Sequence, residues 1–359
     1  MSAQAATAPL RRTGPMARFD ELLGREVSLR ALWLLRVLVG PIVLLHLAPF
    51  LSDSLDGHTY QDVFHEPYAS WYPELPEGAY IGVLWLGAVA AVGMSAGALA
   101  RLATLTRVAT AVTFGVVAYN VFLSTTHFHN NRAYLVIVLG VLAVAPVAQA
   151  GVAWPLWLLR FECAAIYGAS GLSKLLDPDW FGGTVTWQRM SRARGDLDFL
   201  PDRVVSLLTN RDFHTGAAKF IVLTELFIAL GLWSRRTRYA AVWVAVIFHV
   251  TIEASASVQV FSFLGLAVLL IWAVPSTRDR VLRVEPGTPL ARTVRALDWL
   301  ARFRVEPAAP GSGVEVVDRD GTTIRGRPAV AFALSRLPLT AWFALPTLLL
   351  PAVRRARAA

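Results

Sequence analysis

The sequence predicts an all-α protein: a polytopic integral membrane bundle of about eight spanning helices, with a small α/β appendage at the C-terminal end. Of the 359 residues, 55% are hydrophobic and 16% are charged. This composition is less charged than that of an ordinary soluble domain. Arginines gather between long apolar segments, and a charged tail follows the last segment. We therefore expect most of the chain to lie in a lipid bilayer, so that the bilayer lipids are its expected partners.

Eight apolar segments approach the length of about 20 residues that crosses a bilayer as a helix. They are residues 31–51, 78–99, 105–124, 133–150, 154–175, 216–233, 239–256 and 258–275. Arginines precede the first segment, whereas the loop after it holds six acidic residues and neither lysine nor arginine. The positive-inside rule then predicts a cytoplasmic N-terminus, and an even number of crossings places the C-terminus there too. The loop at 177–215 disagrees, because it carries five arginines on the predicted outer side.

The chain divides into three regions. Residues 1–18 are polar and expected to be disordered, residues 19–275 form the transmembrane domain, and residues 276–359 form the cytoplasmic appendage. Within the appendage, an amphipathic helix is predicted at 290–302 and a β-hairpin at 314–324, turning at Asp320-Gly321. Prolines interrupt the last apolar run, 337–350, which predicts an interfacial segment, with a ninth crossing as the alternative.

Several functional classes are excluded or disfavoured. The net charge of +9 comes from arginines between apolar segments, so it indicates membrane topology and no nucleic-acid partner. The single cysteine, Cys163, allows neither an internal disulfide nor a Cys-x-x-Cys pair. No phosphate-binding glycine loop or serine-hydrolase elbow occurs. The His127-x-His129 pair is a weak metal signal, and no metal is expected.

Ionisable residues inside the apolar segments are the first candidates for function, because each is costly in hydrocarbon. In the fifth segment, one helical face carries Arg160, Cys163, Tyr167, Ser170 and Lys174, at spacings of three and four. That face should point into the bundle. The alternative is that Lys174 and Arg160 extend to the two membrane interfaces.

Two further segments and one loop carry polar side chains. Glu225 lies in the sixth segment, and His249 and Glu253 lie four residues apart in the seventh. The spacing of His249 and Glu253 predicts either a hydrogen-bonded pair that fixes helix packing or a proton relay. The loop from Thr125 to Arg132 is densely polar. Counting crossings puts this loop at the same membrane face as Lys174, so the two could line one pocket.

The motif from Tyr167 to Lys174, followed by Asp179-Trp180 and Gly182-Gly183, resembles the signature of the vitamin K-dependent γ-carboxylase-like transmembrane family, the HTTM domain family. The resemblance extends over about residues 20–275. Its further motifs are Asn130-Asn131-Arg132, the segment from Glu225 to Arg238, Phe248-His249 and Phe261-Ser262-Phe263.

The resemblance implies a reaction. A lysine at the position of Lys174 would deprotonate a reduced isoprenoid quinone of the vitamin K hydroquinone type; with O2, this yields a strong base that lets CO2 add to a substrate glutamate. An amine in an apolar bundle suits this role, because burial disfavours its charged form. Candidate catalytic residues are Lys174, His129 and Arg132. Candidate pocket-lining residues are Asn130, Asn131, His127, Tyr167, Trp180, Glu225 and His249.

The sequence departs from the family pattern in two places. The family's carboxylases have a histidine where this chain has Arg132, and a guanidinium is no base at neutral pH. An assisting role there is electrostatic, or passes to His127 or His129. The chain also has a short appendage instead of a large lumenal region, so recognition of a protein substrate by the family's route is not expected.

Two functions from different classes follow. The first is carboxylase-like chemistry on a lipid-soluble ligand, which requires a pocket with Lys174 at its wall. The second is a non-enzymatic membrane protein that binds lipid or an unknown partner protein, in which Lys174, Glu225 and His249 satisfy one another in the core. A transporter is disfavoured, because no internal repeat is found.

Overall fold

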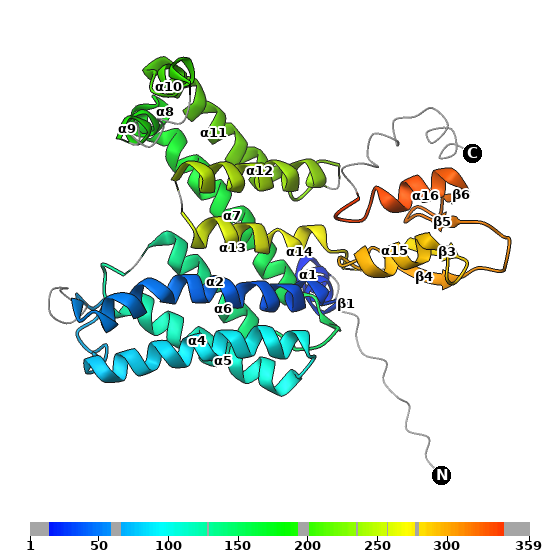
Figure 1. The fold of residues 1–359 in the computed structure, drawn as a ribbon, viewed down its shortest axis with the longest axis horizontal. Helices are drawn as coiled ribbons and strands as arrows, with labels where there is room; N and C mark the ends of the chain where they lie inside the picture. Colours follow the sequence, from blue (N-terminus) through cyan, green and yellow to red (C-terminus); the bar gives the residue numbers. More distant parts are fainter. Residues whose placement is uncertain are drawn as a thin grey trace, which may run out of the picture.

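The computed structural model describes residues 14–58, 66–127, 129–192, 201–234, 236–256, 258–276 and 280–340, and these are mostly helical (Figure 1). The longer helices before the appendage are α1 (Pro15–Gly24), α2 (Arg30–Leu55), α4 (Glu77–Leu99), α5 (Ala103–Leu123), α6 (Asn130–Val144), α7 (Trp154–Leu176), α11 (Arg211–Gly231), α12 (Arg238–Ala256) and α13 (Val260–Val268). Short helices α8 (Pro178–Phe181), α9 (Thr184–Arg192) and α10 (Asp202–Leu208) connect α7 to α11, and α14 (Leu270–Ala273) follows α13.

Every one of the eight predicted apolar segments contains a helix, but they are not equal as membrane spans. Four described helices, α2, α4, α5 and α11, are long and apolar enough to cross a bilayer. Helix α6 has 15 residues, and α13 with α14 covers only 260–273. At about 1.5 Å per residue, α6 reaches about 23 Å, which is short of a hydrocarbon core of about 30 Å. The apolar helices make this a membrane protein, and the eight crossings remain a prediction.

The helices form two groups that α13 connects. Helix α2 packs on α4, α4 packs on α5 and α5 packs on α6, while α7 pairs with α11 and α11 packs on α12. Helix α13 contacts α2, α6 and α12, and it lies between the two groups in Figure 1. Close approach of α2 and α4 depends on Gly40, since a β-carbon there would lie 2.6 Å from the carbonyl oxygen of Ala91.

Two arginines, Arg36 and Arg160, bind the carbonyl oxygens at the ends of short helices. Arg36 of α2 is 2% exposed and donates hydrogen bonds at the end of α6, to the carbonyl oxygens of Leu142 (2.7 Å), Ala145 (2.9 Å) and Pro146 (3.4 Å). Arg160 of α7 donates to the carbonyl oxygen of Ile271 in α14. The last carbonyls of a helix have no partner within it. Arg160 therefore provides hydrogen-bond donors for a carbonyl oxygen near the end of α14.

The appendage is a four-stranded sheet with two helices. Strands β3 (Arg280–Val284), β4 (Phe303–Pro307), β5 (Glu315–Val317) and β6 (Thr323–Arg325) lie in the order β4-β3-β5-β6, with β3 and β4 parallel and the other pairs antiparallel. Helices α15 (Pro289–Leu297) and α16 (Arg327–Leu334) complete it, and the core includes Leu282, Val316 and Phe332. The predicted hairpin is confirmed as β5 and β6, with Gly321 at φ 84°.

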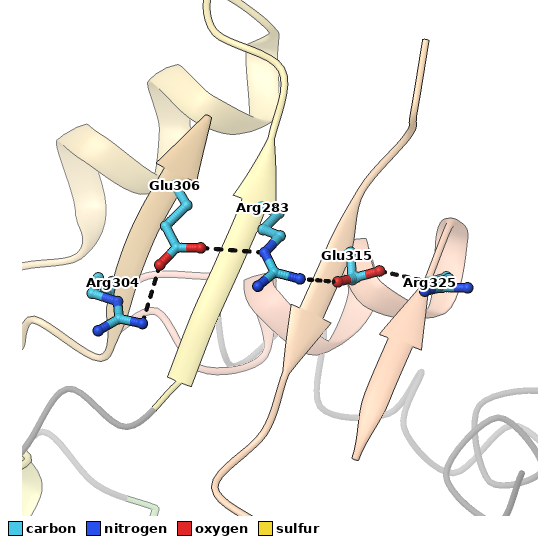
Figure 2. A network of polar contacts seen from close by, with 5 residues as sticks. All are labelled: Arg283, Arg304, Glu306, Glu315 and Arg325. Atoms are coloured by element: carbon cyan, nitrogen blue, oxygen red, sulfur yellow. Dashed lines mark hydrogen bonds and ion pairs between the residues drawn. The ribbon is translucent and has the colours of Figure 1, made fainter. Parts of the chain in front are cut away.

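One face of this sheet carries a ladder of alternating charges, drawn in Figure 2. Arg304 and Glu306 on β4 are 3.1 Å apart, and Glu306 lies 3.2 Å from Arg283 on β3. Arg283 also reaches Glu315 on β5 at 2.7 Å, and Glu315 reaches Arg325 on β6 at 2.8 Å. The ladder therefore crosses all four strands.

The appendage is attached to one end of the helical domain. Arg302 donates to the Tyr239 hydroxyl (2.6 Å) and to the carbonyl oxygen of Ala273 (2.9 Å), and Arg30 donates to the carbonyl oxygen of Trp299 (2.6 Å). At the same end, strands β1 (Glu26–Ser28) and β2 (Ala150–Val152) pair antiparallel. The first turns of α2, α7 and α12 therefore lie at the appendage end.

Two sequence expectations differ at the ends of the chain. Helix α1 begins at Pro15, inside the stretch expected to be disordered, because proline suits the first turn of a helix and the apolar Phe19, Leu22 and Leu23 follow. Residues 1–13 and 341–359 lie outside the described residues, so most of the predicted interfacial segment at 337–350 is not described.

Candidate functional site

A buried ion pair lies between α7 and α11, near the last turn of α7. The Lys174 ammonium is 2.7 Å from Glu225 Oε1 and 2.9 Å from Oε2, and it also donates to Ser170 Oγ at 2.5 Å. Ser170 in turn donates to Glu225 Oε1 at 3.0 Å. The side chain of Glu225 is 5% exposed and that of Lys174 is 16% exposed. An ammonium has three donor hydrogens, so these contacts occupy all three.

The local sequence explains why these groups meet. Ser170 and Lys174 are four residues apart on α7 and therefore share a face. Gly171 lies between them, and a β-carbon there would be 3.2 Å from the β-carbon of Glu225, so glycine permits the close approach of α11. After α7, the Asp177 carboxylate accepts from the backbone N–H groups of Asp179 and Trp180, which starts α8. That turn places the Trp180 ring 5.1 Å from Lys174 Nζ.

A second polar contact joins α7 to α12, about one helical turn before Ser170 on α7. The Tyr167 hydroxyl and His249 Nε2 of α12 are 2.5 Å apart, and His249 is 1% exposed. The sequence-based pairing of His249 with Glu253 is not what the structure describes: Glu253 Oε2 accepts from the backbone N–H of Gln259 at 2.8 Å. The helical spacing favoured the pair, but Tyr167 on the neighbouring helix reaches the imidazole.

A second cluster lies in the other helix group. The Tyr80 hydroxyl of α4 donates to Asn120 Oδ1 of α5 at 2.6 Å, and Asn120 Nδ2 is 3.4 Å from His46 Nε2 of α2. All three side chains are buried. His127 Nδ1 is 3.0 Å from the carbonyl oxygen of Asn120. The sequence analysis missed Tyr80, His46 and Asn120, because each is a lone polar residue in an apolar helix with no spacing pattern.

The Asn-Asn-Arg motif forms the first turn of α6 and not a loop. Arg132 donates to the carbonyl oxygen of His127 at 2.7 Å, and its guanidinium lies 4.8 Å above the Phe50 ring. A pocket of about 240 Å³ lies beside it, lined by Leu45, His46, Pro49, His129, Asn131, Arg132 and residues 258–260. Asn130 is exposed and does not line it.

The predicted site residues therefore fall into two clusters. Lys174, Glu225, Trp180, Tyr167 and His249 belong to the α7–α11–α12 group, and His127, His129, Asn131 and Arg132 belong to the α2–α6 side. Both lie toward the end of the bundle opposite the appendage, because α7 ends there and α6 begins there (Figure 1). No hydrogen bond, ion pair or ring contact joins Lys174 to Asn131 or Arg132 in the described part of the chain.

No metal-binding cluster is found in the part of the chain that the structure describes. Among the described residues, no group of three or more histidine, cysteine, aspartate or glutamate side chains is close enough to hold an ion. The free cysteine, Cys163, is buried on α7, between Arg160 and Tyr167. The chemistry open to the first cluster is that of an amine and a carboxylate sharing protons.

Comparison with known proteins gives one match. Residues 145–276 match the family model of the HTTM domain. This segment holds α7, α11, α12 and α13, and with them Lys174, Glu225 and His249, whereas the Asn130–Arg132 turn lies before it. No curated protein and no solved structure matches the chain.

Proposed function

From the match of residues 145–276 to the HTTM domain, we propose that this chain is a multi-pass membrane protein whose Lys174–Glu225 pair accepts a proton from the hydroxyl of a lipid-soluble ligand. The ligand class is a reduced isoprenoid quinone or a similar prenylated ring. One observation carries the proposal: a lysine and a glutamate are held 2.7 Å apart between helices α7 and α11, with 16% and 5% of their side chains exposed. Such groups are costly in a bilayer and commonly mark a site.

The hydrogen bonds define what each group does. The amine lies within hydrogen-bond distance of three oxygens, so in the proposed step the Glu225 carboxylate is the group that accepts a further proton. Transfer of a hydroxyl proton to Glu225 leaves an oxyanion on the ligand and a neutral carboxyl group. Lys174 then stabilises the oxyanion electrostatically. For Lys174 itself to act as the base, it must first pass its proton to Glu225, so the pair works as one unit.

The surroundings of the pair fit such a ligand. The Trp180 ring beside Lys174 offers an aromatic surface, and Leu172 and Leu176 on the same helix are 51% and 73% exposed. An apolar approach next to one polar pair suits a ring with a prenyl tail. A bound quinol would supply, with O2, the strong base that the family resemblance implies for adding CO2 to a glutamate; this chain's residues hold and deprotonate it.

The test is product formation by the purified full chain in nanodiscs, supplied with a reduced phylloquinone-type quinol, O2 and bicarbonate, with quinone epoxide followed by mass spectrometry. We expect turnover in the wild type and at least a 100-fold loss in Lys174→Met and Glu225→Gln, from removal of the proton site. Lys219→Met is the matched control, because Lys219 is exposed on α11 and contacts the Phe181 ring. A folded wild type with no turnover on several quinols would refute the proposal.

The second candidate is a non-enzymatic membrane protein that binds lipid or a partner protein. It is favoured by the saturation of the Lys174 amine by Ser170 and Glu225, which is what a purely structural ion pair requires. In that case a variant that replaces both charged residues with apolar ones, Lys174→Met with Glu225→Leu, keeps the protein's partner binding. The quinol assay separates the two candidates.

The proposed topology has eight crossings with both termini in the cytoplasm. The appendage and the arginine-rich start of α2 lie at one end of the bundle (Figure 1), as the positive-inside rule favours. The short helix α6 crosses only where the bilayer is locally thin or where neighbouring helices cover its end. Reporter fusions placed after residues 56, 101, 128 and 235 should alternate between outside and inside; a reporter at 56 that reads as cytoplasmic would contradict this topology.

A further inference from the structure

The pocket beside Arg132 is built differently from the Lys174 site, and the proposed function does not use it. It is formed by the C-terminal half of α2, the first turn of α6 and the start of α13, with a volume of about 240 Å³. Leu45 at its edge is 43% exposed, so the pocket reaches the apolar outer surface of the bundle. His129, Asn131 and Arg132 bring polar groups to the same space.

Arg132 is a cation without a counter-ion in the part of the chain that the structure describes. Among the described residues, Arg132 Nη1 donates to the carbonyl oxygen of His127, and the guanidinium lies over the Phe50 ring. It is half-buried. A guanidinium presents five N–H donors, so most of them have no protein partner. A partly desolvated arginine that lines a cavity selects a carboxylate or phosphate.

His46 adds a second donor at this pocket. The Tyr80 hydroxyl occupies Asn120 Oδ1, so the side chain of Asn120 presents its NH2 group to His46 Nε2. Nε2 therefore accepts, and the proton of the neutral imidazole is on Nδ1. Nδ1 is buried and has no hydrogen-bond partner among the residues that the structure describes. A chain of buried polar residues from α4 through α5 to α2 thus ends in an unsatisfied N–H on a residue that lines the pocket.

We propose that this pocket binds the acidic group of a ligand, a carboxylate or phosphate, with Arg132 as its charge partner and His46 and Asn131 as further donors. The acidic group is either the headgroup of an anionic lipid or a free anion, and the two sources present the same chemistry to the pocket. An anion there neutralises Arg132 and gives its remaining donors acceptors. This site is independent of the Lys174–Glu225 pair.

The experiment uses the full chain in nanodiscs of neutral phosphatidylcholine. In one arm, phosphatidic acid is added to the nanodiscs, and the thermal midpoint and the lipid retained in native mass spectrometry are measured. In the other arm, inorganic phosphate and acetate are titrated into neutral nanodiscs. We expect saturable stabilisation in at least one arm, because a ligand that binds the folded state raises its stability.

The variants identify the pocket. Arg132→Gln should weaken the affinity at least tenfold, and Arg132→Lys should stay within about threefold of the wild type, because it keeps the charge. Asn131→Leu fills the pocket and should also weaken binding, without touching the arginine. Arg107→Gln is the matched control, an exposed arginine on α5. Stabilisation in neither arm, or equal stabilisation of wild type, Arg132→Gln and Asn131→Leu, would overturn the proposal.

Discussion

Replacing Lys174 and replacing Glu225 should lower the free energy of unfolding by different amounts. At 2.7 Å and an effective dielectric of 20, the Coulomb attraction is about 6 kcal/mol, and desolvation offsets much of it. Lys174→Met leaves a carboxylate that is 5% exposed, so we expect a loss of about 3 kcal/mol in the free energy of unfolding. Glu225→Gln leaves a lysine at a helix end, 16% exposed, which can extend to the interface; we expect about 1–2 kcal/mol.

The assay is reversible unfolding in mixed micelles, followed by the fluorescence of the chain's 12 tryptophans, of which Trp180 lies beside the pair. The double variant Lys174→Met with Glu225→Gln should lose about 2 kcal/mol less than the sum of the single variants, which is the coupling expected of residues in contact. Lys219→Met, on the exposed side of α11, should be near neutral. Additive effects, or a larger loss in Glu225→Gln than in Lys174→Met, would refute the reasoning.

Three further changes test the fold. Arg36→Gln removes donors from the carbonyls that end α6 and should cost about 1–3 kcal/mol in chemical unfolding. Gly265→Ala places a β-carbon against the His249 imidazole, so we expect a loss of about 1–3 kcal/mol, read as a lower thermal midpoint. In the appendage, the hydrogen bond from Arg325 lowers the pKa of Glu315 below its ordinary 4.5. The stability that this carboxylate contributes is therefore present above pH 4.5 and is lost as the pH falls below it. Hydrogen exchange of the β5 amides measures this loss.

Each of these predictions has its own contradicting result. Gly115→Ala is the control for Gly265→Ala, because nothing lies within 4 Å of a β-carbon at Gly115; equal losses would remove the steric explanation. Hydrogen exchange in Glu315→Gln should show a smaller change between pH 5 and pH 3 than in the wild type, and an unchanged acid response would assign it to other carboxylates. If Arg36→Gln leaves the free energy of unfolding unchanged, water satisfies the last carbonyl oxygens of α6 as well as Arg36 does.

Hydropathy alone located the helices, because lipid-facing and bundle-facing residues are both apolar and leave long uninterrupted segments. It could not set their effective lengths. Helix α6 stops at Val144 although apolar residues continue, since Pro146 cannot extend it and Arg36 on α2 binds its last carbonyls. That contact joins residues about a hundred positions apart, and no local pattern encodes it.

Part of the candidate site could be predicted from the sequence, and the contacts between helices could not. Helical spacing placed Ser170 with Lys174, and burial of charge pointed to Glu225, although which helix supplied the partner could not be read from spacing. The same rule misled at His249, where a partner four residues away was available but Tyr167 from another helix is used. The pocket at His46 depends on one residue from each of several helices, so only the tertiary structure reveals it.

The charge ladder in Figure 2 has a consequence for the way the appendage folds. Strands β5 and β6 are three residues each, and short strands specify their pairing weakly when only a few apolar contacts guide them. A shift of one residue would turn Glu315 to the opposite face and put Val316 in its place between two arginines. Such a shift leaves Arg283 and Arg325 without the carboxylate that lies between them in the observed sheet, so the salt bridges favour the observed register.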